Sequence, residues 1–251
     1  MVLKRRLPSD LGGLALLVSP DASLKYWGRD LQSIDPMLLN AVRNLVLPSD
    51  VIWDVGANVG LFGFASAGLA TRDGNVLAIE PDPWLAQRLR ESCLLKENAG
   101  YRIDILSVAI GDRIGTAVLN IAQRGRATNF ISGLEPSTQA GGIRASVHVI
   151  SVTLDWLLDF WPSPSVVKID VEGSEASVLR GARRLLSKVR PKIICEVSAR
   201  NRSEVSEIFR AMSYAMYDAE TYVRGASPLP DCAWNTIALP AETNRIAIEA
   251  C

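Results

Sequence analysis

Acidic residues follow apolar runs in this sequence at a spacing that suits the binding of a nucleoside. One apolar run ends in Asp54, and Gly56 and Gly60 come directly after it; a second run, Asn75–Ile79, ends in Glu80, twenty positions after Gly60. Glycine lets a ligand approach the backbone closely, and the free N–H groups of a helix that starts there face the ligand. In nucleotide-binding α/β folds, an acid about 20 residues beyond the glycine turn binds ribose hydroxyls. The pattern therefore predicts a nucleotide site.

Two other function classes share this arrangement of a strand, a glycine turn and a helix. A nicotinamide-dependent oxidoreductase also has a strand, a glycine turn and a ribose acid, but here Asn58 occupies the middle of the turn and the three-glycine arrangement is absent. A binding protein without turnover is the second alternative. Carboxylates at Asp54, Glu80, Asp170 and Glu172 argue against it, because a degenerate site has no use for so many acids at strand ends.

The composition describes one neutral chain with a sizeable core. The sequence has 251 residues, 48% of them hydrophobic, with 27 Lys and Arg against 27 Asp and Glu. Net charge therefore gives no reason to expect a nucleic-acid partner. The 4 cysteines form no CxxC pair and there is 1 histidine, so neither a disulfide framework nor a Cys/His zinc site is expected. A reducing cytoplasm fits this cysteine usage.

Residues 1–34 are predicted to form an N-terminal extension. Short apolar alternations broken at residues 19–21 indicate a small hairpin, which could be a lid or an edge. The basic residues 4–6 before the apolar run 11–18 loosely imitate a secretory signal, but Asp10 and two prolines interrupt it and no small-residue cleavage pattern follows. The run is too short to span a bilayer. We therefore expect no integral membrane segment.

Beyond residue 35, strand-like and helix-like segments alternate through residue 251, which predicts one α/β domain with a mostly parallel sheet and ligands at the carboxyl ends of its strands. The segments that read as strands are 51–53, 75–79, 103–108, 165–169, 192–195, 214–217 and 234–239. A helix is expected from about Trp84 to Asn98. Thr116–Ile121 and Ser146–Val152 alternate as two further strands, antiparallel to each other. Between them, Gln123–Gly142 reads as a mobile loop, and long loops of this kind are typically either functional or disordered.

Six blocks of the sequence, in this order, carry a resemblance to a known family. They are DVGANVG at 54–60, IEPDP at 79–83, AIGD at 109–112, TLD at 153–155, KIDVEGSE at 168–175 and RGA at 180–182. Together they resemble the FkbM family of S-adenosylmethionine-dependent methyltransferases, over about Val51 to Leu239. The resemblance implies a Rossmann-like class I methyltransferase fold, a doubly wound α/β fold with a mostly parallel seven-stranded sheet.

The resemblance also implies which residues bind the cofactor, S-adenosyl-L-methionine. They are Asp54, Gly56, Asn58, Gly60, Glu80, Asp82, Val108 and Asp112. Asp54 and the two glycines would line the methionine part, and Glu80 would take the ribose hydroxyls. The adenine would lie near Asp82 and the loop from Val108 to Asp112. Asp112 could accept a hydrogen bond from the ring amino group, or it could be a solvated turn carboxylate.

Family membership would imply methylation of a hydroxyl on a sugar, a glycan or a secondary metabolite. Such a transfer needs the acceptor oxygen held in line with the methyl group and gains from a base. Asp170 is the predicted base or substrate-orienting group, supported by Glu172, although Glu172 could instead cap the following helix. Lys168 could neutralise one of these carboxylates, and Glu196 is a further acid.

The single histidine, His148, is a second candidate for general base because an imidazole titrates near pH ~6.5. It lies in the strand-like segment beside the loop, where a surface or core histidine is the alternative. Asp170, Glu172 and an Asn could also hold Mg²⁺, since hard oxygen ligands suit that ion. The sequence lacks a decisive ligand set, so no metal is predicted.

Overall fold

The computed structural model describes residues 1–28, 30–133 and 140–242. Its core is a seven-stranded sheet in the order β12-β13-β11-β10-β3-β4-β5, in which β13 runs antiparallel to its neighbours β11 and β12 and the strands from β11 to β5 are parallel. The strands are β3 (Val51–Val55), β4 (Asn75–Ile79), β5 (Ile103–Leu106), β10 (Val166–Ile169), β11 (Lys192–Glu196), β12 (Tyr214–Asp218) and β13 (Asn235–Pro240). The predicted mostly parallel α/β sheet is confirmed.

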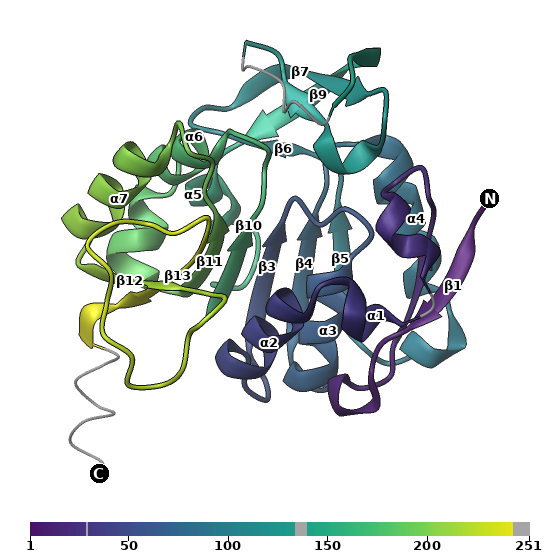
Figure 1. Ribbon diagram of the computed structural model, residues 1–251, viewed down its shortest axis with the longest axis horizontal. Coiled ribbons are helices and arrows are strands. Elements are labelled where there is room, and N and C mark those ends of the chain that lie inside the picture. Colours follow the sequence, from purple (N-terminus) through teal and green to yellow (C-terminus); the bar gives the residue numbers. More distant parts are fainter. Residues whose placement is uncertain (29, 134–139, 243–251) are drawn as a thin grey trace.

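Helices cover both faces of this sheet (Figure 1). One face packs against α1 (Leu31–Ile34), α2 (Pro36–Leu45), α3 (Leu61–Ala70), α4 (Pro83–Cys93) and the N-terminal hairpin of β1 (Leu3–Arg6) and β2 (Ala15–Val18). The other face packs against α5 (Leu154–Leu157), α6 (Glu175–Arg180) and α7 (Arg202–Ala211). The hairpin expected with its turn at residues 19–21 is wrong, because β2 pairs with the earlier strand β1 and residues 24–27 form a 3₁₀ turn. The observed hairpin packs into the same core as α2 and α3.

The helix predicted to reach Asn98 ends at Cys93, so that prediction was wrong by about one turn. Asn98 lies instead in a short 3₁₀ turn, and its side-chain amide bonds both the N–H and the C=O of Ala15 at 2.8 and 2.7 Å. The contact ties β2 to the end of α4, which a continued helix would prevent. The remaining short turns are 3₁₀ helices at Ser9–Leu11, Leu24–Trp27 and Arg126–Thr128 and a π-helical turn at Leu185–Val189.

A second, four-stranded sheet lies over the carboxyl ends of the core strands and is called the cap sheet here (Figure 1). Its strands, in the order β6-β9-β7-β8, are β6 (Ala109–Ile110), β7 (Gly115–Ala122), β8 (Phe130–Ile131) and β9 (Ile143–Val152). The predicted antiparallel pairing of β7 with β9 is confirmed. The strand expected over 103–108 divides instead, because the chain leaves β5 after Leu106 and enters the cap sheet as β6.

The segment 123–142, expected to be one loop, contains the Arg126–Thr128 turn and the short strand β8. Its residues 134–139 lie outside the described part of the chain. Within the described ranges, every helix is too short or too polar to cross a bilayer.

Candidate active site

Four core strands present acidic or basic side chains on one face of the sheet. Ile52, Ala78, Val166 and Ile194 pack on the face that the N-terminal hairpin covers. Side chains two residues further along a strand point the same way, so Asp54, Glu80, Lys168 and Glu196 share this face. All four lie at or near the carboxyl ends of their strands, where the cap sheet begins.

Lys168 is the buried centre of this group. Its Nζ lies 3.3 Å from Asp54 Oδ1 and 3.2 Å from Asp170 Oδ2, and it donates a hydrogen bond of 2.8 Å to the carbonyl of Gly56. Asp54 is fully buried and also accepts the N–H of Gly63 at 2.9 Å. Burial raises the pKa of Asp54, and the Lys168 charge acts against that rise. The lysine that the sequence left as a secondary candidate therefore links the sheet interior to Asp170.

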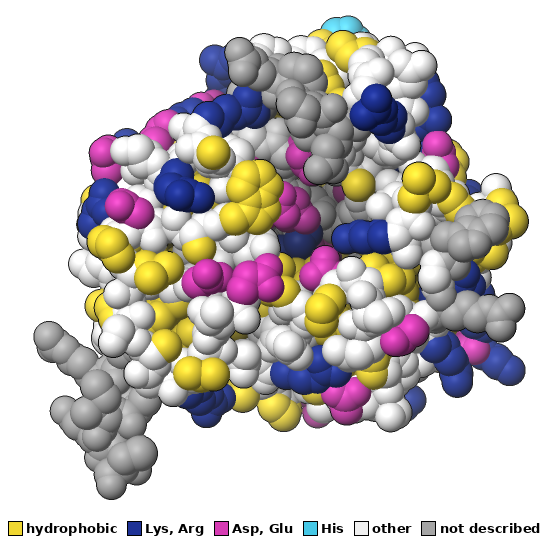
Figure 2. All heavy atoms as spheres, in the orientation of Figure 1, with side chains coloured by type: hydrophobic (Ala, Val, Ile, Leu, Met, Phe, Trp, Pro, Cys, Tyr) yellow, Lys and Arg dark blue, Asp and Glu magenta, His cyan; other side chains and the backbone are white. Residues whose placement is uncertain are grey.

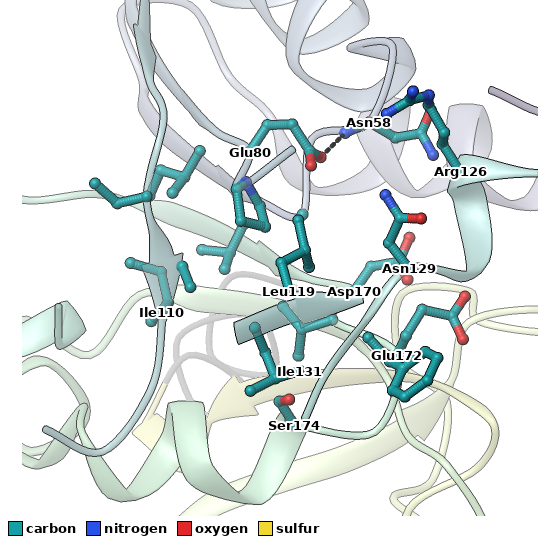
Figure 3. Close-up of a pocket in the computed structure, with 18 of the residues that line it drawn as sticks. Asn58, Glu80, Ile110, Leu119, Arg126, Asn129, Ile131, Asp170, Glu172 and Ser174 are labelled. Carbon is teal, nitrogen blue, oxygen red and sulfur yellow. Dashed lines mark hydrogen bonds between the residues drawn. The ribbon is translucent and has the colours of Figure 1, made fainter. Parts of the chain in front are cut away.

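A pocket opens above these residues, between the core strands and the cap sheet. Figure 3 shows Ile110, Leu119 and Ile131 on its apolar side, and Asn58, Glu80, Asp170 and Glu172 around its polar side. All three apolar residues come from the cap sheet, Ile110 from β6, Leu119 from β7 and Ile131 from β8. A mostly apolar wall with a few converging polar groups is typical of a small-molecule site.

Glu80 and Asn58 lie at the end of the pocket where the sequence predicts the nucleoside. The two carboxylate oxygens of Glu80 accept the N–H groups of Asn58 and Asp82 at 2.8 and 2.9 Å, and the first bond is drawn in Figure 3. Burial raises the pKa of Glu80 to about 7. The side-chain oxygen of Asn58 is buried and has no hydrogen-bond partner in the described structure. Such an atom calls for a donor, and a bound ligand would supply one.

Gly56 is needed for the close approach of two strands. It has φ +76°, and a Cβ placed there would lie 1.8 Å from the carbonyl oxygen of Asp170. A larger residue would therefore push apart the two strand ends that carry the pocket's polar groups.

Two carboxylates, Asp170 and Glu172, line the pocket away from Glu80, and Glu196 lies next to them outside the lining. One oxygen each of Asp170, Glu172 and Glu196 lies within 4.8 Å of the others. Burial, and then the charges of Asp170 and Glu196, raise the pKa of Glu172 to about 8. Burial and the charge of Asp170 raise the pKa of Glu196 to about 7. Figure 2 shows acidic side chains gathered around the hollow in the middle of the face shown.

The strand before Asp170 does not continue through Glu172. The strand β10 ends at Ile169, and Glu172 lies in a turn with φ +45°, a backbone conformation that costs energy for any residue except glycine. The turn nevertheless brings its carboxylate next to Asp170. Glu172 does not cap the following helix either: the N-cap residue of α6 is Ser174, and Glu175 in the first turn accepts the N–H of Gly173 at 2.6 Å.

Several predicted site residues do not line this pocket. Asp54 and Gly60 are buried outside the pocket lining. Asp82 accepts hydrogen bonds from the N–H of Trp84 and from the side chains of Arg126 and Asn129, which follow β7. Asp112 is exposed, and its carboxylate pairs with Arg180 at 3.3 Å. His148 lies on the exposed side of β9, away from the pocket, because its neighbours Val147 and Val149 take the inward positions of the strand. The structure therefore brings no support to the catalytic role predicted for His148.

Of the other predicted residues, Gly56 and Val108 do line the pocket. Residues 126–131, which the sequence left in an unassigned loop, form one wall through Arg126, Asn129 and Phe130. Two Arg and one Asn in a segment otherwise poor in large apolar residues were the signal that could have pointed to them.

The sheet order, the cap at the strand ends, the ribose-type acid Glu80 and the unpartnered Asn58 oxygen define a class I methyltransferase, and these residues fit S-adenosylmethionine. Residues 54–222 match the Methyltransferase FkbM domain. Because this match covers more than half of the chain, the protein belongs to the FkbM family, whose members use S-adenosylmethionine. The resemblance that the sequence motifs carry is confirmed.

Two similar proteins show the range of this likeness. The hexuronic acid methyltransferase AglP of Haloferax volcanii is 29% identical over 203 residues, which cover 76% of this chain and 74% of AglP. The crystal structure of Methyltransferase FkbM from Methylobacillus flagellatus superposes with a TM-score of 0.51 at 17% identity, covering 86% of this chain and 57% of that one. At this identity the second likeness shows the fold alone.

Proposed function

We propose that this protein transfers the methyl group of S-adenosylmethionine to a hydroxyl of a sugar or glycan. The observation that carries the proposal is the carboxylate cluster of Asp170, Glu172 and Glu196, of which Asp170 and Glu172 line the pocket away from Glu80. Carboxylates accept hydrogen bonds from hydroxyls, and one of them can take the proton as the new bond forms. The relative AglP, named for a sugar acid, supports a sugar as the acceptor.

The residues divide into two groups in this proposal. Glu80, Asn58 and the wall of Ile110 and Ile131 hold the cofactor, which supplies a methyl group on a sulfonium. Asp170 binds the acceptor hydroxyl and receives its proton, with Glu172 beside it. Lys168 fixes the direction of the Asp170 carboxylate through their contact of 3.2 Å. The apolar cap side chains exclude water, which the methyl transfer requires.

We also propose that the acceptor sugar carries no carboxylate next to the reacting hydroxyl. The charges that reach the Glu172 carboxyl, from Asp170, Glu196 and Glu175, are all negative. The nearest lysine, Lys168, is already shared between two carboxylates. A uronate at this place would meet the carboxylate of Asp170 and two acids whose raised pKa values already reflect an excess of negative charge, so a neutral sugar fits better.

The first test is calorimetric titration with S-adenosylhomocysteine and, in parallel, a reduced nicotinamide cofactor. Micromolar binding of the first alone supports the proposal, and binding of the nicotinamide alone would overturn it. Formation of S-adenosylhomocysteine would then be followed with neutral hexoses and hexuronic acids, each offered as a methyl glycoside and as a nucleotide sugar. Faster turnover of the hexuronic acids would contradict the charge argument.

The reducing cytoplasm remains the proposed location. The described cysteines Cys93, Cys195 and Cys232 are free thiols, and free thiols are typical of reducing compartments. A nucleic-acid acceptor is not proposed, because the equal numbers of acidic and basic residues give no basic footprint.

A further inference from the structure

One arginine of the cap joins three separate parts of the molecule. Arg126 follows β7, and its side chain is 16% exposed. Its Nε donates to Asp21 at 3.0 Å, and its Nη1 donates to Asp82 at 2.5 Å. Its guanidinium also lies 4.7 Å from the centroid of the Trp84 ring. Asp21 belongs to the N-terminal extension, and the side chain of Asp82 is 1% exposed at the start of α4.

Backbone contacts repeat the connection to the N-terminal extension. The N–H groups of Arg126 and Ala127 donate to the carbonyls of Asp21 and Ala22 at 3.0 and 2.9 Å. Arg144 of β9 donates to the other carboxylate oxygen of Asp21 at 2.9 Å. The carboxylate of Asp21 therefore holds both the segment after β7 and the strand β9.

The segment held in this way is one wall of the cofactor pocket. Arg126, Asn129 and Phe130 line the pocket. Asn129 also fixes this segment: its side-chain N–H group donates to Asp82 at 2.8 Å, and its side-chain oxygen accepts the N–H of Ala122 at 2.9 Å. Asp21 lies outside residues 54–222, the part of the chain that matches the family domain.

We propose that Arg126 is a positioning residue that holds the 126–131 wall against the cofactor pocket, and that Asp21 makes the N-terminal extension part of the active site. The planar guanidinium can serve two carboxylates in two directions at once, which a lysine ammonium on a flexible stem cannot reproduce. The wall and the extension then move together, so loosening the contact at Asp21 opens the pocket. This inference rests on the proposed function only in taking S-adenosylmethionine as the pocket's ligand.

The test is Asp21→Asn, which removes the charge but keeps the shape of the side chain. We expect the dissociation rate of S-adenosylhomocysteine, measured by stopped flow, to rise about tenfold. The KM for S-adenosylmethionine should rise by a similar factor while kcat stays near wild type. Hydrogen exchange should become faster in the peptide that contains residues 126–131, a change that a purely structural role elsewhere in the extension would not produce.

Asp10→Asn is the matched control. Asp10 lies in the same extension and pairs with Arg43 at 2.7 Å, on an exposed surface outside the pocket lining. This variant should keep wild-type dissociation rates and exchange. Equal behaviour of Asp21→Asn and Asp10→Asn would overturn the inference while leaving the proposed function intact. Failure of the wild-type protein to bind S-adenosylhomocysteine would overturn both.

Arg126→Lys provides a second measurement. It keeps one positive charge between Asp21 and Asp82 but loses the two-directional contact, so the dissociation rate should rise as it does in Asp21→Asn. Because both changes break the contact between Arg126 and Asp21, the rise in the double variant should be smaller than the product of the two single rises. Additive effects would mean that the two residues act independently, which contradicts the proposal.

Discussion

Lys168 and Asp170 form an ion pair, with 3.2 Å between nitrogen and oxygen, that joins the buried centre of the sheet to the open pocket. The same ammonium lies 3.3 Å from Asp54, which is fully buried beneath the pocket. Stability and activity therefore depend on one side chain, for different reasons. The Lys168 ammonium compensates the buried carboxylate of Asp54, whereas it fixes the orientation of the Asp170 carboxylate.

We predict that Lys168→Met strongly destabilises the protein. The change leaves Asp54 as an uncompensated buried charge, which costs about 3–5 kcal/mol of unfolding free energy. Urea denaturation followed by circular dichroism measures this loss. Lys192→Met is the control, since Lys192 begins the neighbouring strand β11 at its far end from the pocket. Adding Asp54→Asn to Lys168→Met should restore part of the stability, and no restoration would show that the Asp54 charge is not the cause.

Asp170→Asn should lower kcat and leave cofactor binding intact. An amide keeps the size of the side chain but cannot receive the proton of the acceptor, and general base catalysis contributes about 10²–10⁴-fold. The affinity for S-adenosylhomocysteine, measured by calorimetry, should change little. Asp104→Asn is the control because Asp104 is an exposed carboxylate on β5. Full turnover in Asp170→Asn would transfer the role of base to Glu172 or Glu196.

Glu172 should make stability depend on pH in a defined direction. Its pKa is raised to about 8, chiefly by burial, so between the ordinary glutamate value and about 8 the unfolded chain has lost a proton that the folded protein retains. Its contribution to stability is therefore complete in acid and is lost as the pH rises through this window. Glu172→Gln does not titrate, so its stability relative to wild type should increase from about pH 5 to about pH 9.

Urea midpoints at the two pH values measure this difference. A gain in Glu172→Gln that is the same at both pH values would mean that the carboxyl titrates normally in the folded protein.

The backbone at Glu172 offers a separate prediction. Its φ of +45° is unfavourable for a side chain with a Cβ, and glycine adopts it freely. Glu172→Gly should therefore be more stable than Glu172→Ala by about 1 kcal/mol, although both lack the carboxylate. Both variants should lose activity to the same extent. If the alanine variant is the more stable one, the turn relaxes when the carboxylate is removed, and the strain is not stored there.

The sequence predicted the parts of the fold that depend on local pattern. Apolar runs such as Asn75–Ile79 became core strands with the bounds expected, because buried parallel strands need continuous apolar residues. The convergence of Glu196 with Asp170 was not predictable, since it depends on the register between β10 and β11. The position of His148 depends on which face of β9 turns outward, and the alternation alone did not decide this.

The wall of residues 126–131 was missed for a related reason. Its anchors, Asp21 and Asp82, lie 105 and 44 positions from Arg126 in the sequence, and the pattern of one loop carries no sign of such partners. Lys168 was the opposite case. A lysine between Val167 and Ile169 in a buried strand needs a counter-charge, so the sequence alone could have ranked it above His148.

Glu80→Gln tests the nucleoside end of the pocket. Each carboxylate oxygen of Glu80 already accepts one backbone N–H, from Asn58 or Asp82, and each has a further lone pair for a ligand. In the glutamine variant one oxygen becomes an NH₂ group that faces a backbone donor, so one bond is lost and the turn at Asn58 or Asp82 must shift. We expect the affinity for S-adenosylhomocysteine to fall about tenfold or more, since an unsatisfied buried donor costs about 1–3 kcal/mol.

Glu91→Gln is the control for this variant, because Glu91 lies on the outer side of α4 and pairs with Arg88 at 2.7 Å. Its affinity for S-adenosylhomocysteine should equal that of wild type. Comparison with adenosine and with S-adenosylhomocysteine lacking the ribose 2′-hydroxyl then isolates the contact. If Glu80 holds the ribose, removal of the 2′-hydroxyl lowers the ligand's affinity for the wild-type protein. The same removal then has little effect on the affinity for Glu80→Gln, because that contact is already lost. An equal loss in both proteins would show that Glu80 shapes the turn at Asn58 without touching the ribose.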